Sequence, residues 1–352
     1  MASTQQRPAA TGAPAGAGRD RLSAILDAFG GAWIVLILVG LIVVFTVLTG
    51  GTFFSAENFK NLALDTSEIL ILAAGMTFII IAAGLDLSVG SLVVFTSVVA
   101  AQLMVDVGGE TQANGLITYP DLALGLVVGI GAALLSGAAW GLVNGFIGVK
   151  LRVPPFIVTL GTLGMALGFA QVITGGLNVS GVPPQLQEFF GLGELFGLIP
   201  WPVVTAAVVV GALWLVLSRT RYGLRTYAVG SNLEGARRAG INVDRHVISL
   251  YVLMGVLCGI VGVIDVARFN TASIAAHTQD NLAAIAAVVI GGTSLFGGSG
   301  KMLGTVIGAF IPSILRNGFI LLDVQPFWQN VAVGAVLILA VYLDQLRRRR
   351  AP

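Results

Sequence analysis

The sequence predicts an all-α membrane protein built from about ten transmembrane helices. Hydrophobic residues make up 56% of the 352-residue chain and charged residues only 10%, whereas charged residues form about a quarter of an ordinary soluble domain. Apolar stretches of about 20 residues, the length that spans a bilayer, recur along the chain between short polar connections. No soluble core could bury this much apolar surface, so we expect it to be distributed as membrane spans.

The spans follow from the apolar stretches taken in order. They are expected at about 32–49, 66–83, 88–105, 122–140, 156–174, 202–217, 248–267, 282–297, 302–322 and 328–343. Residues 69–105 carry one charge, Asp86, and would be about 55 Å long as a single helix. That is too long for one crossing of about 30 Å, so we expect two helices joined near Gly84–Gly90.

The basic residues predict the orientation of these spans. Placing the N-terminus in the cytoplasm puts every Lys and Arg inside except Lys60, Arg268 and Arg316. We therefore expect both termini to be cytoplasmic. Residues 1–30 are rich in Ala, Gly, Pro and Gln and are expected to form a disordered cytoplasmic tail. Residues 31–345 are expected to form a single ten-helix transmembrane domain, and residues 346–352 a basic cytoplasmic tail.

Residues 218–247 form the longest polar interruption, on the expected cytoplasmic side. Ser231 and Glu234 have the spacing of a capping box, and Gly240 suits the position just after a helix end. We therefore expect a short helix from about Asn232 to Ala239. One interpretation is that this helix is presented to a motor domain. The other is a solvated basic loop that serves only orientation.

Two Gly-rich interruptions, at 84–90 and 291–300, also stand between apolar stretches. Irregular backbone inside a membrane domain is tolerated only where protein or a water-filled path satisfies its polar groups. Asp86, Ser88, Thr293 and Ser294 could therefore line a path or gate and hydrogen-bond a passing polyol. Asp86 could instead cap a helix by accepting from the amide of Ser88 or Val89, and both roles could coexist.

Arg316 falls within an expected span, and Asp265 and Arg268 lie near the end of another, where charges are expensive unless they face protein or water. Arg316 has no carboxylate at helical spacing, and it and the adjacent Asn317 are further candidates for the path. Asp265 and Arg268 are three residues apart on one expected helix, which predicts an ion pair between them.

Small residues recur at helical spacing in several spans. The glycines concerned are Gly137, Gly141 and Gly145, then Gly161, Gly164 and Gly168, then Gly255 and Gly259, and finally Gly304 and Gly308. Such stripes allow membrane helices to approach closely. We expect each to be a packing face.

Several site types are excluded by residue counts and spacing. Cys258 is the only cysteine, and two histidines exclude most histidine-built metal sites. Residues 296–302, FGGSGKM, approach a phosphate-binding loop but have Leu295 and Met302 where that loop requires Gly and Ser or Thr. An enzyme constellation is also missing. We expect no nucleotide, cofactor or metal on this chain and no nucleic-acid partner.

Three motifs, in order along the chain, carry a family resemblance. Residues 83–90 read AGLDLSVG, residues 285–300 read IAAVVIGGTSLFGGSG, and the cytoplasmic loop has the order Gly230, Asn232, Ala236, Arg237, Gly240 and Ile241. Together with PPFIVTLG at 154–161, they resemble the permeases of ribose/galactoside-type ABC importers, with coverage from about residue 55 to 345. Gly235 replaces the usual first Ala of the loop motif, and Asn281 and Ala283 stand where the family usually has Glu and Asp.

The resemblance implies a function and an assembly. It implies a bacterial inner-membrane, multi-pass permease with the type II, cobalamin-importer-like arrangement, working as a homodimer that imports a monosaccharide by alternating access. A separate ATP-binding cassette ATPase, carrying ATP and Mg, would dock on Asn232, Glu234, Gly235, Ala236, Arg237, Arg238 and Gly240. An extracytoplasmic sugar-binding protein would deliver the sugar. The alternative is an ion-coupled secondary transporter of a small neutral solute. Such carriers usually need acidic groups at mid-membrane, and only Asp86 comes close to that position.

Overall fold

The computed structural model describes residues 32–109, 111–113, 116–325, 327–329, 331–332, 334–335, 338 and 342. The expected tails at 1–30 and 346–352 lie outside the described residues, as does part of the expected span at 328–343. Within the described part, the chain is predominantly helical, as predicted, with two short β-hairpins.

The elements follow the chain from α2 to α13. They are α2 (Ala32–Leu48), η1 (Thr52–Phe54), α3 (Ala56–Ile81), α4 (Val89–Gly108), β1 (Thr111–Ala113), β2 (Leu116–Thr118), α5 (Leu122–Lys150), α6 (Pro155–Thr174), α7 (Pro184–Leu186), η2 (Gln187–Gly191), β3 (Glu194–Leu195), β4 (Ile199–Pro200), α8 (Trp201–Arg219), α9 (Arg221–Ser231), α10 (Leu233–Arg238), α11 (Val243–Phe269), α12 (Asp280–Ile290) and α13 (Met302–Leu321). The strands pair as antiparallel β1–β2 and β3–β4.

Seven of the described helices are long and apolar enough to cross a membrane: α3, α4, α5, α6, α8, α11 and α13. Helix α2 is apolar but shorter, as is α12. The expected span at 282–297 is wrong in length, because α12 has 11 residues and reaches only about 16 Å. It ends where Gly291 and Gly292 turn the chain away.

Two helices extend about ten residues beyond one of their predicted ends. Helix α3 begins at Ala56, where Ser55 Oγ accepts from the Asn58 amide at 3.2 Å. Its first turns carry Glu57, Lys60 and Asp65, which made them resemble a loop in the sequence. At the other end of the bundle, α5 continues to Lys150.

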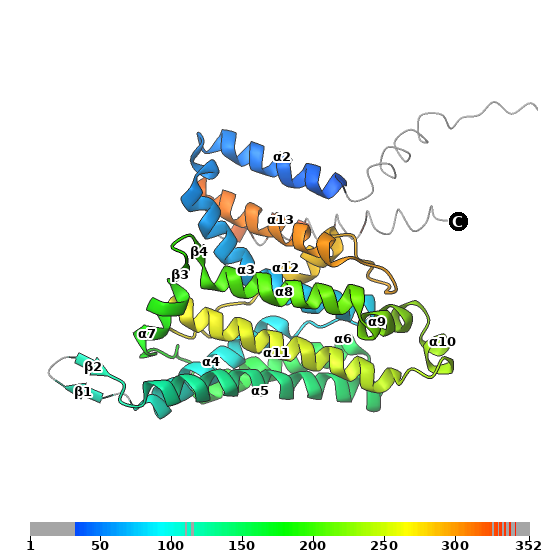
Figure 1. Cartoon of the computed structure of the whole chain (residues 1–352), viewed down its shortest axis with the longest axis horizontal. Coiled ribbons are helices and arrows are strands. Elements are labelled where there is room, and N and C mark those ends of the chain that lie inside the picture. The colour runs from blue at the N-terminus through cyan, green and yellow to red at the C-terminus, as the bar shows by residue number, and fades with distance from the viewer. Residues whose placement is uncertain are drawn as a thin grey trace, which may run out of the picture.

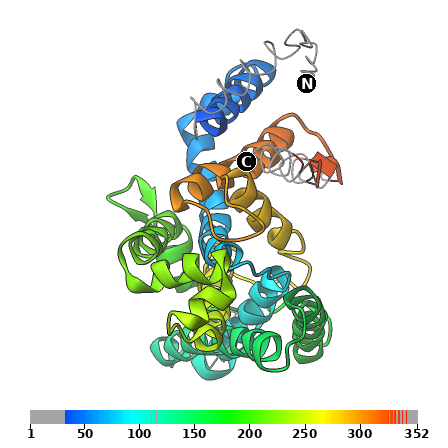
Figure 2. The same cartoon turned by 90° about the vertical axis from the view of Figure 1, so that its right-hand side faces the viewer.

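The long helices lie side by side along the long axis of the molecule, with α2, α13, α8, α11 and α5 stacked in that order across Figure 1. Viewed end-on in Figure 2, α2 lies at one edge, beside α13. Helices α9 and α10 lie at one end of the bundle, which we call the α10 end. Both β-hairpins lie at the opposite end, which we call the hairpin end.

The tightest helix contact joins α5 and α11 through glycine, as predicted. A side chain at Gly137 would collide with the Gly255 carbonyl, and one at Gly141 with the Tyr251 carbonyl. Gly304 and Gly308 bring α13 against α12 in the same way. The prediction is wrong for α6 within this chain, because Gly161, Gly164 and Gly168 have nothing within 4 Å among the described residues.

Helices α4 and α12 both begin inside the bundle. Val89, the first residue of α4, accepts a hydrogen bond from Cys258 Sγ (3.7 Å), near the middle of α11. The start of α12 lies against it, since Asn281 Nδ2 donates to the Leu87 carbonyl at 3.2 Å and Gly90 packs on the His277 carbonyl. From this junction, α4 runs to the hairpin end and α12 to the α10 end.

Candidate functional site

The short cytoplasmic helix predicted at 232–239 is present as α10, and both of its ends are capped. Asn232 Oδ1 accepts from the Gly235 amide at 2.8 Å, so the N-cap is Asn232 and not Ser231, which ends α9. At the other end, Gly240 adopts a left-handed φ of 81°. The amides of Gly240 and Ile241 donate to the carbonyls of Arg237 and Ala236, closing a Schellman motif.

The residues expected to contact an ATPase divide into an exposed and a structural group. Asn232, Glu234, Arg237, Arg238 and Gly240 are exposed, as is Leu233. Ala236 is buried and packs in an apolar cluster with Val229 and Val243, whereas Gly235 is half-buried and donates to the cap. The exposed surface of α10 therefore offers apolar, acidic and basic groups on a rigid support.

An ion-pair network ties α10 to the bundle. Asp244, in the first turn of α11, accepts from Arg237 Nη2 (3.2 Å) and from Lys150 Nζ (2.8 Å) at the end of α5. All three side chains are partly exposed, so each pair contributes little to stability. Arg238 has no ion-pair partner among the described residues, so its guanidinium is free to contact another protein.

Helix α9 connects α10 to the two Gly-rich interruptions. A side chain at Gly230 would collide with the Ile81 carbonyl at the end of α3. The same carbonyl accepts from the Gly298 amide at 2.8 Å. Tyr227 Oη donates to the Gly300 carbonyl at 2.8 Å, and burial raises the pKa of this phenol, which keeps it a donor. The three sequence motifs thus meet at one place at the α10 end.

Asp86 and Ser88 lie deeper, in a buried network that sequence reasoning only half identified. Asp86 Oδ1 accepts from the Ser88 amide (2.9 Å) and hydroxyl (2.5 Å). Asn144 Nδ2 of α5 donates to Ser88 Oγ at 2.9 Å, and Thr162 Oγ1 of α6 donates to Asn144 Oδ1 at 2.7 Å. The network therefore fixes the start of α4 to α5 and α6.

The hydrogen bond expected from the capping interpretation of Asp86 is present, because the carboxylate accepts from the Ser88 amide. The helix itself starts at Val89, with Ser88 as N-cap, so Asp86 forms a turn just before the helix. Its Oδ2 is buried without a hydrogen-bond partner among the described residues. A role of Asp86 in lining a path stays a prediction.

The remaining path candidates do not share a surface with Asp86 in this conformation. Thr293 and Ser294 are buried inside the 291–301 loop, where Ser294 Oγ accepts from the Phe296 amide. Asn317 is buried on α13 and donates to Asn58 Oδ1 at 3.0 Å, and Arg316 is exposed with no ion pair among the described residues.

The larger cavity found in the described bundle is unsuited to a polyol. The larger, about 360 Å³, lies between α3, α8 and α13 and is lined by apolar groups including Leu70, Trp214 and Phe310. A second, about 90 Å³, lies at the junction of α4 and α12. Binding sites for polar ligands place several convergent polar groups around the ligand, which the larger cavity lacks.

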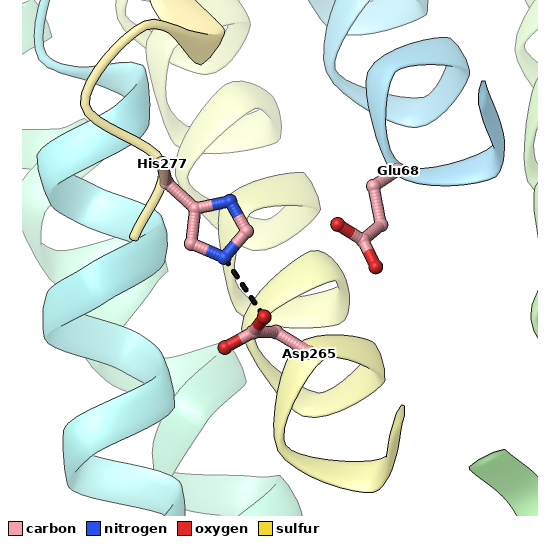
Figure 3. A group of neighbouring side chains, drawn as sticks. All are labelled: Glu68, Asp265 and His277. Carbon is pink, nitrogen blue, oxygen red and sulfur yellow. Dashed lines mark ion pairs between the residues drawn. The ribbon is translucent and has the colours of Figure 1, made fainter. Parts of the chain in front are cut away.

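The predicted ion pair between Asp265 and Arg268 is wrong. Arg268 pairs across to α3, with Glu68 at 2.6 Å and Asp65 at 2.7 Å. Asp265 instead faces His277, whose Nε2 lies 3.0 Å from Asp265 Oδ1 (Figure 3). Sequence spacing identified neither partner, because both come from other segments. The only sign in the sequence that such partners exist was the presence of charged residues in apolar spans, where charges need a partner.

Comparison with known proteins agrees with the motifs. Residues 58–341 match the family described as branched-chain amino acid transport system / permease component. The chain is 40% identical to the ribose import permease protein of Escherichia coli, over 88% of this chain and 93% of that protein. It is 34% identical to the fructose import permease protein of Rhizobium meliloti (90% and 85% covered) and to the xylose transport system permease protein of Escherichia coli (89% and 91%). No solved structure matched the chain.

Proposed function

The chain belongs to the permease-component family of branched-chain amino acid-type transport systems, and from that premise we propose that it is the membrane permease of an ATP-driven monosaccharide importer. The observation that carries the proposal is the agreement among relatives. Three that match along most of their length are named for import or transport of ribose, fructose and xylose. All three solutes are small neutral polyols, which fits a membrane domain with few buried acids.

We propose that energy enters through α10. The chain lacks the residues of a phosphate-binding loop at 295–302, so ATP and Mg would bind on a separate ATPase that docks on Asn232–Gly240. Movement of α10 would pass to α9 and then to Ile81 and Gly298. Because Ile81 leads directly into residues 82–88, the contact at Gly230 would couple the ATPase to the start of α4.

The proposed translocation path lies between two copies of the chain, in a type II arrangement. The larger cavity within one chain offers almost no hydrogen-bonding groups, and Arg316 and the glycine face of α6 are exposed. A second copy could cover such surfaces and complete the path. The gate would then be shaped by Asp86, Ser88, Thr293, Ser294 and Asn317. Arg316 would reach the path itself.

The proposed orientation places the α10 end in the cytoplasm of a bacterial inner membrane, with both termini on that side. An extracytoplasmic sugar-binding protein would dock at the hairpin end. Asn281, which replaces a family Glu, turns inward to the Leu87 carbonyl, and Ala283 is buried. Docking of the binding protein would therefore rest on the hairpins and connecting segments at that end.

The experiment is uptake of labelled ribose, xylose and fructose by cells that lack their own importers. The chain is expressed with its ATPase and binding protein, with and without Arg237→Glu and Arg238→Glu. We expect ATPase co-purification to fall at least about tenfold, because two basic groups of the proposed docking surface become acidic and charge complementarity with the ATPase is lost. Arg152→Glu, exposed at the same end, is the control and should change nothing.

Two results would argue against the proposal. Normal uptake by the doubly reversed variant would remove α10 as the docking site. Uptake in cells without the ATPase, driven by a sodium or proton gradient, would favour the ion-coupled alternative.

A further inference from the structure

A buried histidine and two buried carboxylates converge where α3, α11 and the segment before α12 meet. Glu68 comes from α3, Asp265 from α11 and His277 from the connecting segment, and one ligand atom from each lies within 4.8 Å of the others. Figure 3 shows the three side chains pointing into one space. Their side chains are 9%, 4% and 7% exposed, respectively.

The charges around this space do not balance among the described residues. The carboxylates of Glu68, Asp265 and Asp280 face one guanidinium, that of Arg268, which is bonded to Glu68. With a neutral imidazole, two negative charges are left in excess. Buried charges in proteins are paired or coordinate metal ions, so this space is short of positive charge.

The hydrogen bonding of His277 indicates what is missing. Its Nδ1 lies 2.6 Å from Asp280 Oδ2, which fixes Nδ1 as the donor and leaves a lone pair on Nε2 in the neutral ring. Nε2 is buried and makes no well-directed hydrogen bond, although Asp265 Oδ1 is 3.0 Å away. A cation in this space could accept the buried lone pair of Nε2 and pair with the Asp265 carboxylate.

The alternative is an imidazolium that donates from Nε2 to Asp265. Asp265 Oδ1 is within reach at 3.0 Å, but Nε2 makes no well-directed hydrogen bond to it or to any other described residue. The carboxylate–histidine arrangement of Asp280 and His277 is instead the one that orients metal-bound histidines. The backbone of His277 is also left-handed, with φ 58°, a strained conformation that presents the ring to this space.

We propose that Glu68, Asp265 and His277 form a binding site for a divalent transition-metal cation. One imidazole nitrogen and two carboxylates suit zinc, with Nε2 as the nitrogen ligand and Asp280 holding the ring. His277 also lines the neighbouring 90 Å³ cavity, together with Ser91 and Asn281, and that cavity has room for water. The ion would hold α3, α11 and the segment before α12 together, and so would brace the junction with α4.

The test uses the purified full-length chain in lipid nanodiscs, carrying no histidine tag. The protein is stripped with EDTA, and Zn²⁺ binding is measured by equilibrium dialysis with elemental analysis. We expect about one Zn²⁺ per chain and a higher thermal unfolding midpoint when Zn²⁺ is added. X-ray absorption at the zinc edge should report nitrogen and oxygen ligands without sulfur, because Cys258 is elsewhere in α11.

Three variants locate the site. His277→Asn keeps a residue that tolerates the left-handed backbone and should weaken binding at least about tenfold. Asp265→Asn and Glu68→Gln, which keep the side-chain shapes, should do the same, and Asp280→Asn should weaken it about 10- to 100-fold through the ring. His246→Gln, which alters the other histidine, is the control and should bind as the wild type does.

Three outcomes would overturn the metal-site proposal. Absence of Zn²⁺, Mn²⁺ and Co²⁺ binding by the folded wild type overturns the proposal. So does binding that survives His277→Asn and both carboxylate variants, or that is lost with His246→Gln. None of these results bears on the proposed importer function, since each measures metal content and stability alone.

Discussion

Replacing Asn144 by alanine should destabilise the bundle by severing the network at the start of α4. Asn144 is 1% exposed and makes two interhelical hydrogen bonds, to Ser88 at 2.9 Å and from Thr162 at 2.7 Å. Interhelical hydrogen bonds in membrane proteins contribute about 0.6 kcal/mol on average and up to about 1.7. With the packing of the lost amide added, we expect Asn144→Ala to lower the free energy of unfolding by about 2 kcal/mol.

A matched pair on α6 controls this experiment. Thr162→Val removes one interhelical bond and should lower the free energy of unfolding by about 0.6 kcal/mol. Thr159 is equally buried but bonds only to the Pro155 and Phe156 carbonyls of its own helix, so Thr159→Val should have a smaller effect. The assay is reversible unfolding in mixed detergent micelles, followed by circular dichroism. A change below about 0.5 kcal/mol for Asn144→Ala would refute the reasoning.

Three further variants test other contacts. Gly240→Val forces a branched residue into a left-handed backbone, which should destabilise the end of α10 by about 1–2 kcal/mol and weaken ATPase co-purification, whereas Gly240→Asn should be tolerated. In the metal-free protein, Arg268→Met leaves Glu68 buried and uncompensated, which should cost about 3 kcal/mol in thermal unfolding. Glu68→Gln should rescue this variant, whereas rescue by Asp265→Asn in its place would favour the sequence-predicted pair of Asp265 and Arg268. Gly141→Leu should prevent α5 from packing on α11 and lower the folded fraction in gel filtration. Gly131→Leu, at a glycine of α5 with nothing within 4 Å, is the control, and an equal loss with it would contradict the described packing.

The sequence predicts most of the fold because hydrophobic length is a local property. The break between α3 and α4 was predictable, since a 37-residue stretch with a single charge is too long for one span and the Gly-rich segment marks the turn. The early end of α12 was not predicted, because the expected span at 282–297 included the first residues of the Gly-rich interruption at 291–300. Its short length depends on a junction inside the bundle, which hydropathy does not report.

The cytoplasmic helix was predictable in position and less so in detail. Gly240 marked its end, since only a residue that accepts a left-handed backbone closes a Schellman motif well. Its start was placed one residue early, because Ser231 and Asn232 are both good N-caps. The choice between them follows from α9, which continues through Ser231.

Contacts between distant segments were beyond sequence reasoning. Asn144 could have been noted as a polar residue inside an apolar span, but its partners Ser88 and Thr162 could not. In the same way, Arg268 has a carboxylate at helical spacing and yet pairs with Asp65 and Glu68, about 200 positions earlier. Helix periodicity predicts which side chains are neighbours on one helix. Which of several possible partners a charged side chain actually meets depends on how the helices pack.

The most direct test of the whole account is solute accumulation in proteoliposomes. Vesicles carry the permease with its ATPase and binding protein, and ATP is confined to the side that faces α10. The account predicts that labelled monosaccharide accumulates against its gradient on the ATP side, and that accumulation stops when the ATPase is omitted. Accumulation by the permease alone, or movement away from the α10 side, would contradict it.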